Sequence, residues 1–534
     1  MRVSQRGARR EACLKAEKKD LSNPRTKQKP KKGFLAQAVA GRRIPVRHRV
    51  VRRVGQLADE LGLEVYAVGG YVRDLLLGRP SKDIDFVVVG DGVAFARKVA
   101  KALGARTVIV YERFGTASIP YRGYNLEFVT ARAESYREDS RKPEVRQASL
   151  ETDLARRDFT INAIALGIRA SDLGVILDPF DGLGDLQRRI IRTPLDPIET
   201  FHDDPLRILR AIRFATQLEF HIERRTKEAI RSERQRLRIV SQERITDELL
   251  KILAARRPSI GFRLMAETGV LDVILPEVSA LRGVEQIGRY HHKDVFEHTL
   301  KVVDRVARVS DDLRLRYAAL MHDIAKPRTK AFKEGVGWTF HGHDEIGARM
   351  IRDISRRLKL PNDFSRYAEK LTRLHLRPIA LVEEGVTDSA IRRLIVQAGD
   401  DLQDLLTLCR ADITSRNPER VRRHLANFDR LVRRIHEVEE KDRMRAFQSP
   451  VRGDVIMQVC NIPPGPLVGK LKKMIEEAIL DGRIPNEYDA AYQYLLQIKD
   501  EVLGQETAGT RAGKPEGADS ERAEQAQETP GSGA

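Results

Sequence analysis

The sequence predicts a small α/β head with a mixed sheet, followed by an elongated body that is entirely helical. Two observations support this fold class. Segments with the strand period of two alternate with helical segments up to about residue 130. From about residue 155 onward, nearly every long segment has helical period and strand signals vanish. With 534 residues, 41% of them hydrophobic, the chain is long enough for three or four domains with real cores.

The head is expected to open with an amphipathic helix, because Val50, Val54, Leu57 and Leu61 share one helical face and Gly62 ends the pattern. We then expect a strand over residues 63–68, a helix over 71–77, a strand over 83–89 and a helix over 93–103. Three more strands are expected over 107–111, 117–121 and 125–130.

The net charge of +19 favours polyanionic partners, above all nucleic acid. A basic tail on an ordinary enzyme is the alternative, since residues 1–49 supply much of the excess. The three cysteines are too few and too scattered for a disulfide framework, which indicates a reducing, cytoplasmic setting. We expect no membrane partner, because no run approaches the roughly 18 uncharged apolar residues of a membrane helix and no secretory signal opens the chain.

Two carboxylates, Asp83 and Asp85, flank one isoleucine at the start of the predicted strand 83–89. Because strand side chains alternate, both point to the same side and repel one another unless a cation lies between them. Glu127, in the strand 125–130, offers a third carboxylate that a neighbouring antiparallel strand could bring beside the pair. Three carboxylates can hold two Mg²⁺ ions about 3.5–4 Å apart, which predicts nucleotidyl transfer. The purely structural explanation is that Asp83 is a turn residue and that Glu127 lies on a solvated strand face.

Gly69 and Gly70 end a predicted strand and open a helix. Without Cβ atoms, backbone N–H groups there can approach an anion closely, and Arg73, one turn further, adds positive charge. A tight turn would explain the glycines equally well, but together with the nearby carboxylates they predict a metal and triphosphate site.

Four stretches between about residues 65 and 220 resemble, in order, the motifs of the class II tRNA nucleotidyltransferases, the CCA-adding and poly(A) polymerase family. They read "GGYVRDLLLG…DIDF", "RRDFTINAIA", "DPFDGLGDLQRRIIRT" and "DDPLRILRAIRFA". The resemblance implies addition of C, C and A to the 3′ end of tRNA from CTP and ATP, with no nucleic-acid template. It also implies that Asp83 and Asp85 are metal ligands and that Glu127 is the third catalytic carboxylate.

Base selection without a template requires side chains that imitate a Watson–Crick edge. Asp204 and Arg207 are three residues apart and share a helix face; an aspartate accepts from the exocyclic amine of C or A, and an arginine donates to a ring acceptor. Guanine and uracil would leave these groups unpaired, at about 1–3 kcal/mol each. The structural alternative is that Asp204 only caps the N-terminus of a helix whose first residue is Pro205. The family usually has Glu where this chain has Asp203.

By the same resemblance, Arg157 and Asp158 contact the ribose and phosphates of the incoming nucleotide, with a plain ion pair as the alternative. Residues 133–154 lack periodicity and occupy the place of a flexible loop that the family needs for the final adenosine. Their presence argues against an enzyme restricted to adding C.

An ordered series of histidines and aspartates follows on predicted helices, in "FEHTL", "MHDIAKP", "HGHDEIGA", "RLHLRP" and "CRADI". It resembles an HD phosphohydrolase domain, which implies a divalent metal, with Mg²⁺, Mn²⁺ and Ni²⁺ as candidates. The resemblance assigns one metal to His298, His322, Asp323 and Asp412, and a second to His343 and His375, with Lys326 steadying a phosphate.

The C-terminal stretch 463–487 resembles the family's helical end, where Lys470, Lys472 and Lys473 could contact acceptor-arm phosphates; a solvated helix face is equally compatible. The expected division of the chain is a basic disordered arm (1–45), the nucleotidyltransferase head (46–168), a helical neck with the base-selecting motif (169–284), the HD domain (285–420), a helical tRNA-binding tail (421–503) and a low-complexity disordered tail (504–534).

Three other functions remain open at this point. A bacterial poly(A) polymerase has nearly coincident motifs, although those that we associate with this family usually lack an HD domain. The second is a metal phosphohydrolase acting on nucleotides or RNA ends, in which the head would only bind. The third is a pure RNA-binding protein, in which neither predicted metal site would have a catalytic role. The oligomeric state is not encoded in any pattern that we recognise.

Overall fold

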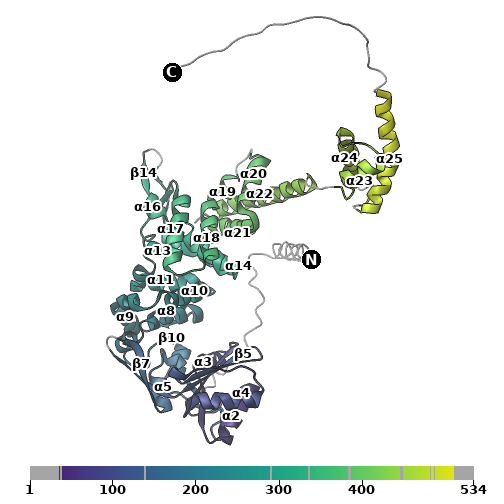
Figure 1. Cartoon of the computed structure of the whole chain (residues 1–534). Coiled ribbons are helices and arrows are strands. Elements are labelled where there is room, and N and C mark those ends of the chain that lie inside the picture. The colour runs from purple at the N-terminus through teal and green to yellow at the C-terminus, as the bar shows by residue number, and fades with distance from the viewer. Residues whose placement is uncertain are drawn as a thin grey trace, which may run out of the picture. The chain divides into compact units, whose positions relative to one another are not determined.

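The computed structural model describes residue 35 and residues 39–509, with gaps at 138–139, 289–290, 335–336, 383–385, 415–416, 446–448, 481–482 and 486. Most of the predicted arm and residues 510–534 of the predicted C-terminal tail lie outside the described residues. The chain divides into two compact units, Met1–Leu431 and Val432–Ala534, and each is described by itself (Figure 1).

The head is built on a seven-stranded mixed sheet in the order β3-β4-β5-β2-β1-β8-β9. At its centre β2 (Asp83–Val89) runs parallel to β5 (Tyr124–Thr130) and antiparallel to β1 (Glu64–Val68). The other strands are β3 (Ile109–Tyr111), β4 (Thr116–Tyr121), β8 (Ala165–Gly167) and β9 (Ile176–Leu177). The helices of the head are α2 (Arg49–Glu60), α3 (Gly69–Leu76), α4 (Gly92–Leu103) and α5 (Leu150–Ala155), with the short 3₁₀ turns η2 (Glu112–Phe114) and η3 (Thr160–Asn162).

Aromatic packing fixes α4 against the sheet. Phe86 of β2 stacks on Phe128 of β5 with ring centroids 4.9 Å apart, and Phe95 of α4 meets Phe128 edge-on at 5.7 Å. All three rings are buried, which anchors the strand that carries Asp83 and Asp85. The α4 helix begins where the Asp91 side chain accepts a hydrogen bond from Ala94 N and ends at left-handed Gly104.

The helices and strands predicted between residues 50 and 130 are confirmed, with ends that differ by one or two residues. The prediction that strand signals vanish after residue 155 is wrong for three two-stranded pairs of the body and for two short strands of the head sheet, β8 just inside the predicted boundary at 168 and β9 beyond it. β8 and β9 have three and two residues, too few to produce a visible period of two. Arg43 also forms a bridge with Val175, and Ile44 is buried, so residues 39–45 pack on the head.

The segment predicted as an aperiodic flexible loop is also different. β6 (Arg132–Arg137) and β7 (Ser140–Gln147) pair as an antiparallel ribbon, and α5 follows them. A two-stranded ribbon is held by its backbone hydrogen-bond ladder, which needs no hydrophobic alternation, so the sequence pattern could not reveal it.

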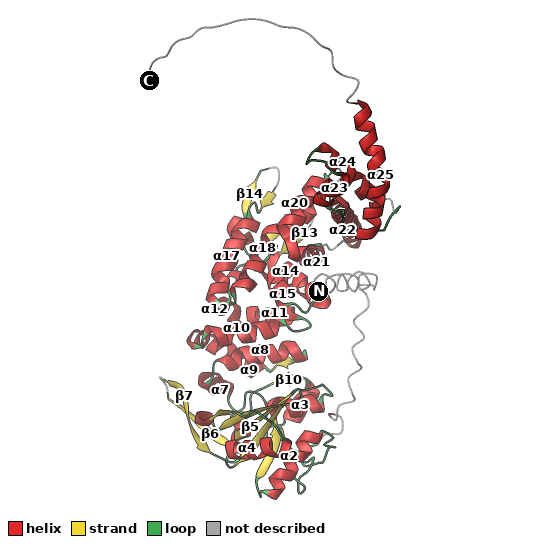
Figure 2. Ribbon diagram, turned by 45° about the vertical axis from the view of Figure 1, so that its right-hand side comes forward, coloured by secondary structure: helices red, strands yellow, loops and turns green. Residues whose placement is uncertain are grey.

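A helical neck follows the head. Its first elements are α6 (Gly182–Arg188), α7 (Pro197–Asp203), α8 (Leu206–Leu218), α9 (Arg224–Glu233) and the two-stranded pair β10 (Ile190–Ile191) and β11 (His221–Ile222). It continues through η4 (Arg234–Ile239), α10 (Gln242–Leu253), α11 (Pro258–Thr268), α12 (Val270–Ile274) and α13 (Pro276–Ser279). Figure 2 shows these helices in red, in contrast to the yellow sheet of the head.

The helices of the HD region come next, from the pair β12 (Glu285–Gly288) and β13 (His291–Asp294) onward. They are α14 (Val295–Val309), α15 (Leu313–Met321), α16 (Lys326–Thr329), α17 (His343–Arg357), α18 (Asn362–Leu374), α19 (Leu376–Ala380), α20 (Asp388–Ala398), η5 (Gly399–Asp401) and α21 (Leu402–Asp412). Between α16 and α17, β14 (Ala331–Lys333) and β15 (Gly337–Thr339) form an antiparallel hairpin.

The second unit begins within α22 (Pro418–Arg445) and contains α23 (Gly453–Cys460), α24 (Pro466–Leu480) and α25 (Tyr488–Gly509). Its core is formed by apolar side chains such as Val451, Ile456, Leu471, Ile475 and Leu495, which are fully buried. The helix α25 extends past residue 503, where we predicted the disordered tail to begin.

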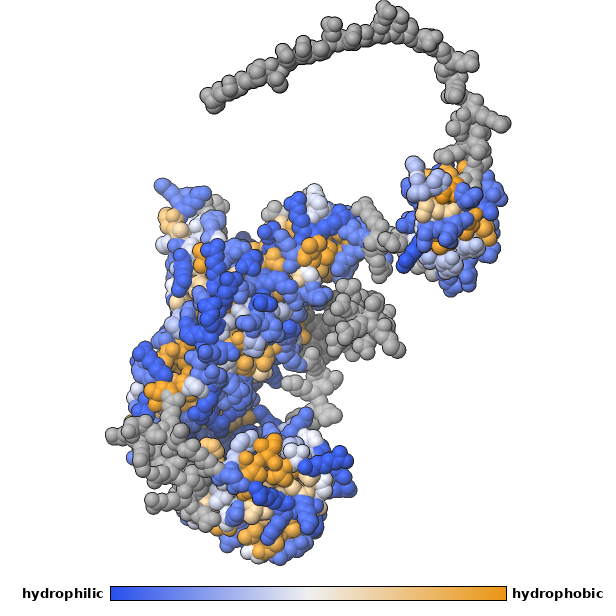
Figure 3. Space-filling view, in the orientation of Figure 1, coloured by the Kyte–Doolittle hydropathy of each residue, from blue (hydrophilic) through white to orange (hydrophobic). Residues whose placement is uncertain are grey.

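No helix in the described part of the chain is long and apolar enough to span a bilayer. On the face seen in Figure 3, the described surface of the helical body is largely hydrophilic, with separate apolar areas.

Candidate functional site

The head carboxylates share one side of the sheet. Asp83 and Asp85 are two residues apart on β2, and Asp85 lies in register with Glu127 of β5. We predicted that Glu127 would reach the pair from an antiparallel strand, and this is wrong, because β2 and β5 are parallel. The chain leaves β2 through α4 and returns through the β4–β5 hairpin, so it re-enters in the same direction. In-register residues of parallel strands face the same way, so Glu127 still lies beside Asp85.

Gly69 is the residue against which this acidic face rests. Its φ is +69°, and a Cβ built on it would lie 2.9 Å from Asp85 Oδ2 and 3.1 Å from Arg157 Nη1. A side chain at this position would therefore displace both charged groups. A Cβ at Gly70 would lie 3.5 Å from Arg73 Nη2, an ordinary contact, so only the first glycine of the pair is required by the packing.

The electrostatics of Asp85 fit a cation. Burial raises the pKa of Asp85, Arg157 lowers it, Asp83 raises it and Arg73 lowers it, with a net upward shift. A carboxylate held in such a place gains from a metal ion, and carboxylate oxygens are the ligands that Mg²⁺ prefers. Among the described residues, the two groups whose ligand atoms all lie within 4.8 Å of one another are in the HD region, so the head carboxylates are not gathered that tightly.

A buried polar network lies behind the acidic face. Asp158 accepts hydrogen bonds from Arg210 Nε (2.9 Å), Arg210 Nη2 (2.6 Å) and Asn162 Nδ2 (2.9 Å). Burial alone would raise its pKa, but Arg210 and Asn162 lower the pKa of Asp158 to about 2. Arg73, which is buried, donates from Nη1 to Asn162 Oδ1 at 2.8 Å and so joins the same network.

Beside this network, Arg157 is held by a second buried carboxylate. Arg157 donates from Nη2 to the fully buried Asp153 at 3.1 Å, while its Nη1 lies near Gly69. Sequence reasoning missed Asn162, Asp153 and Arg210. Arg210 could have been found, because it is three residues from Arg207 and thus on the same helix face; no sequence signal links Asn162 to either arginine.

The predicted base-selecting pair lies where α7 meets α8. Asp204 accepts from Leu206 N at 3.2 Å, as a helix-capping carboxylate does, and its other oxygen lies 3.3 Å from Arg244 Nη2. Arg207 donates from Nη2 to the carbonyl oxygen of Arg156 at 2.7 Å. The structure therefore brings the two residues to one helix start, and both are half-buried.

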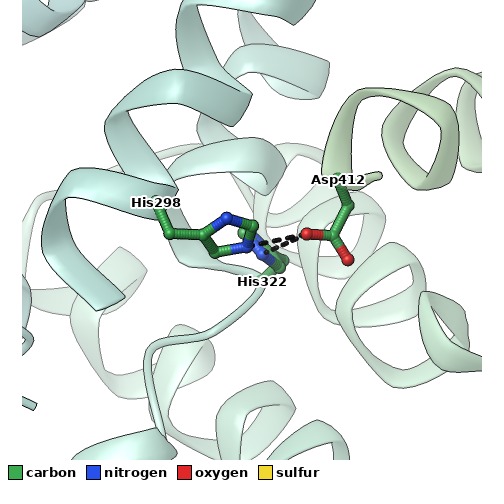
Figure 4. A group of neighbouring side chains, drawn as sticks. All are labelled: His298, His322 and Asp412. Atoms are coloured by element: carbon green, nitrogen blue, oxygen red, sulfur yellow. Dashed lines mark ion pairs between the residues drawn. The ribbon is translucent and has the colours of Figure 1, made fainter. Parts of the chain in front are cut away.

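The HD region brings six predicted ligands together. His298 Nε2 lies 2.7 Å from Asp412 Oδ1, and His322 Nε2 lies 3.7 Å from the same oxygen (Figure 4). A second group contains Asp323, His343 and His375, whose ligand atoms also lie within 4.8 Å of one another.

Asp323 lies between the two groups. Its Oδ2 is 3.2 Å from His322 Nε2, and its Oδ1 is 3.5 Å from His343 Nε2. Lys326 Nζ lies 2.7 Å from Asp323 Oδ2. One carboxylate thus faces both histidine groups, an arrangement that fits a pair of metal ions with a shared ligand.

The histidines are oriented for metal binding by their outer ring nitrogens. Nδ1 of His322, His343 and His375 contacts a backbone carbonyl oxygen three residues earlier, at 2.9, 2.7 and 2.5 Å, and Nδ1 of His298 lies 2.9 Å from Thr414 Oγ1. Each Nε2 is then directed at the centre, the arrangement that metal-binding histidines adopt. Nε2 of His322 is buried and lies 3.2 Å from Asp323 Oδ2 without a well-aligned hydrogen bond.

The charges around His322 also favour a bound metal ion. Burial would lower its pKa, but the carboxylates of Asp323 and Asp412 raise the pKa of His322 to about 10. These carboxylates thus attract a positive charge of the kind that a metal ion supplies, and the residues present fit a divalent metal. A cavity of about 620 Å³ opens onto the site, lined by residues that include Lys326, Phe340, His341 and Asp412.

Lys470, Lys472 and Lys473 lie on α24 of the second unit. Lys472 and Lys473 lie 3.9 and 3.8 Å from Glu476 and Glu477, one helical turn away. These surface pairs favour the solvated-face explanation for two of the three lysines without excluding a phosphate contact.

Comparison with known proteins identifies the family. Sequence models of the Poly A polymerase head domain, the probable RNA and SrmB-binding site of polymerase A, and the HD domain match residues 65–192, 219–281 and 295–416. The chain is 33% identical over 435 residues to the A-adding tRNA nucleotidyltransferase of Deinococcus radiodurans, covering 79% of this chain and 93% of that protein. The chain belongs to the tRNA nucleotidyltransferase family.

Other members of this nucleotidyltransferase family differ in their names. The multifunctional CCA protein of Ralstonia nicotianae is 37% identical, covering 59% of this chain and 72% of its own. The CC-adding tRNA nucleotidyltransferase of Thermus thermophilus is 31% identical, covering 80% and 92%. A solved tRNA nucleotidyltransferase complexed with a primer tRNA and an incoming ATP analog superposes with a TM-score of 0.51 at 27% identity, covering 71% of this chain and 98% of that one.

Replacing Asp85 by asparagine is expected to reduce nucleotide incorporation by this nucleotidyltransferase at least about 100-fold, the scale of losing one transition-state-stabilising group. The melting temperature should stay the same or rise, because the change removes a half-buried carboxylate that Asp83 repels. Incorporation of labelled nucleotide and thermal unfolding measure the two effects. Glu112→Gln, which alters an exposed carboxylate of the head, should change neither; an active Asp85→Asn protein would contradict the site.

Proposed function

We propose that this chain adds C, C and A to the 3′ end of tRNA, using CTP and ATP and no nucleic-acid template. The observation that carries the proposal is the in-register acidic face of Asp83, Asp85 and Glu127, packed against Gly69 beside Arg157. The net charge of +19 favours an RNA substrate, and a cytoplasmic location suits tRNA.

The reaction forms one bond and breaks one. The 3′ oxygen of the RNA attacks the α-phosphorus of the nucleoside triphosphate, the bond from that phosphorus to the bridging oxygen breaks, and pyrophosphate leaves. The proton of the attacking hydroxyl passes to one of the head carboxylates. Mg²⁺ bound by Asp83 and Asp85 would lower the pKa of the attacking hydroxyl and neutralise the leaving pyrophosphate.

Of the other predicted residues, Arg157, Asp204 and Arg207 would bind the nucleotide directly. Arg157 lies against Gly69, where its charge can meet a phosphate, while Asp158 is tied to Arg210 and would act by holding α8 in place. Asp204 and Arg207 would then present an acceptor and a donor to the base.

The relatives divide into A-adding, CC-adding and CCA proteins, so the product must be determined directly. The purified protein is incubated with Mg²⁺, CTP and ATP and either tRNA lacking its terminal CCA or tRNA ending in CC, and the 3′ ends are sequenced. Completion of CCA on both substrates supports the proposal. Extension of only one of them, a long A tail, or no extension would each overturn it in favour of a restricted enzyme, a poly(A) polymerase, or a function without nucleotidyl transfer.

Arg207→Ala is expected to relax the choice of C and A more than it lowers turnover, because the donor to the base edge is lost while the carboxylates remain. The measurement is incorporation of each of the four nucleotides separately. Arg224→Ala is the matched control, since Arg224 is an exposed arginine of the neck that pairs with Glu228. Intact discrimination against GTP and UTP in Arg207→Ala would refute base imitation.

We also propose a phosphohydrolase activity for the HD region, which rests on the two histidine and aspartate groups that share Asp323. Water would attack a phosphorus atom, the ester P–O bond would break, and the alcohol would leave with the proton. A metal held there would supply positive charge to the phosphate oxygens. Titration of the protein with Mg²⁺, Mn²⁺ and Ni²⁺ identifies the metal.

His322→Ala is expected to abolish hydrolysis of p-nitrophenyl phosphate and to spare nucleotide addition, because His322 belongs only to the HD groups. Metal binding at this site, measured by calorimetry, should be lost with it. His436→Ala, which changes a half-exposed histidine of α22, serves as the control. Loss of both activities in His322→Ala would indicate a structural metal.

We propose that Lys470, Lys472 and Lys473 contribute phosphate contacts to tRNA. The exposed position of Lys470 and Lys473 on α24 is compatible with this role.

A further inference from the structure

The β14–β15 hairpin extends directly from the walls of the HD cavity. Lys326 of α16 lines the cavity just before β14, and Phe340 and His341 line it just after β15. Both arms of the hairpin are thus continuous with residues that face the proposed metal site. No role for this hairpin follows from the nucleotidyl transfer or from the metal ligands.

Aromatic rings and lysines alternate from the cavity out to the hairpin. Lys326 Nζ lies 5.6 Å from the centroid of the Phe340 ring, and Lys330 Nζ lies 4.3 Å from the Trp338 ring. Lys326 also contacts the shared ligand Asp323 at 2.7 Å. The same side of the hairpin therefore carries two ring and cation pairs, the inner one touching the metal site.

Phe332 completes an aromatic surface on the hairpin. Its ring meets Trp338 edge-on with centroids 5.4 Å apart, and the residue is 66% exposed. The exposed ring of Phe332 and the half-exposed ring of Trp338 together form a small aromatic surface that is accessible to a flat ligand. Lys330 and Lys333 outnumber the one acidic residue, Glu334, in this hairpin, so the ligand is expected to be anionic as well as flat.

We propose that this hairpin stacks the bases of a single-stranded RNA end whose terminal phosphate lies at the HD metal site. Nucleobases on aromatic rings with lysines near the backbone are the typical means of binding single strands. A base on Trp338 would leave the adjoining phosphate beside Lys326 and the ligand groups. The proposal rests on the phosphohydrolase function proposed above and names its substrate class.

The chain contains one tryptophan, so tryptophan fluorescence reports on position 338 alone. The full-length protein, without added metal, is titrated with a short oligoadenylate that ends in a 3′ phosphate. We expect saturable quenching by the oligonucleotide and none by inorganic phosphate or ribose 5-phosphate, which have no base to stack.

Phe332→Ala should weaken the oligonucleotide affinity by about 5-fold to 100-fold, the loss expected for one stacked base. Val396→Ala, which shortens an 80% exposed side chain on α20, is the matched control and should leave the affinity unchanged. In hydrolysis assays with added metal, Trp338→Ala should raise KM for the oligonucleotide with kcat unchanged and leave ribose 5-phosphate hydrolysis as it was, whereas Trp338→Phe should largely restore the KM.

Repeating the titration with His322→Ala separates the two proposals. If the oligonucleotide still quenches Trp338 fluorescence while neither the unmodified protein nor any variant shows hydrolysis, the stacking surface is sustained and the proposed phosphohydrolase activity is overturned. Absence of quenching, equal quenching by inorganic phosphate, or an affinity unchanged by Phe332→Ala would overturn the stacking surface even if hydrolysis is found, and would leave a protein partner as the occupant of the hairpin.

Discussion

The ion pair between Asp158 and Arg210 is the contact on which the geometry of the head depends. Asp158 is buried while the Arg210 side chain is 35% exposed; the pair joins the end of the head to α8, and through Asn162 it reaches Arg73 in the last turn of α3. Removing Arg210 would leave the buried Asp158 carboxylate without its main counter-charge, which would destabilise the fold. The helix with the base-selecting pair and the glycine turn at the acidic face are therefore positioned by one network.

The acidic face itself is held together against its own repulsion. β2 and β5 are fixed by their ladder and by the stacked rings of Phe86 and Phe128, so Asp85 and Glu127 cannot move apart by strand displacement. Burial of Asp85 adds to the unfavourable energy. Fixing Asp83 and Asp85 on one rigid strand is a cost to stability that a bound cation would offset, which is typical of sites built for function.

Sequence patterns predicted the features that depend on local periodicity, and failed for those that depend on how distant segments of the chain pack together. The common side of Asp83 and Asp85 follows from the period of a strand, but the direction of the strand that carries Glu127 depends on the path of the chain between them. β8 and β9 are too short to have a pattern. The six HD ligands were identified by resemblance, while the shared position of Asp323 depends on how five helices pack.

The two proposed sites differ in the chemistry of their ligands, and this difference keeps them independent. The head offers only carboxylate oxygens, which favour Mg²⁺, whereas the HD groups combine imidazole nitrogens with carboxylates and so favour transition metals over Mg²⁺. Each set is anchored by its own neighbours: Gly69 and Arg157 in the head, and backbone carbonyl oxygens behind the histidine rings in the HD region. A change of metal or of one ligand can therefore abolish activity at one site while the other site keeps its geometry. A single chain can thus carry both proposed activities.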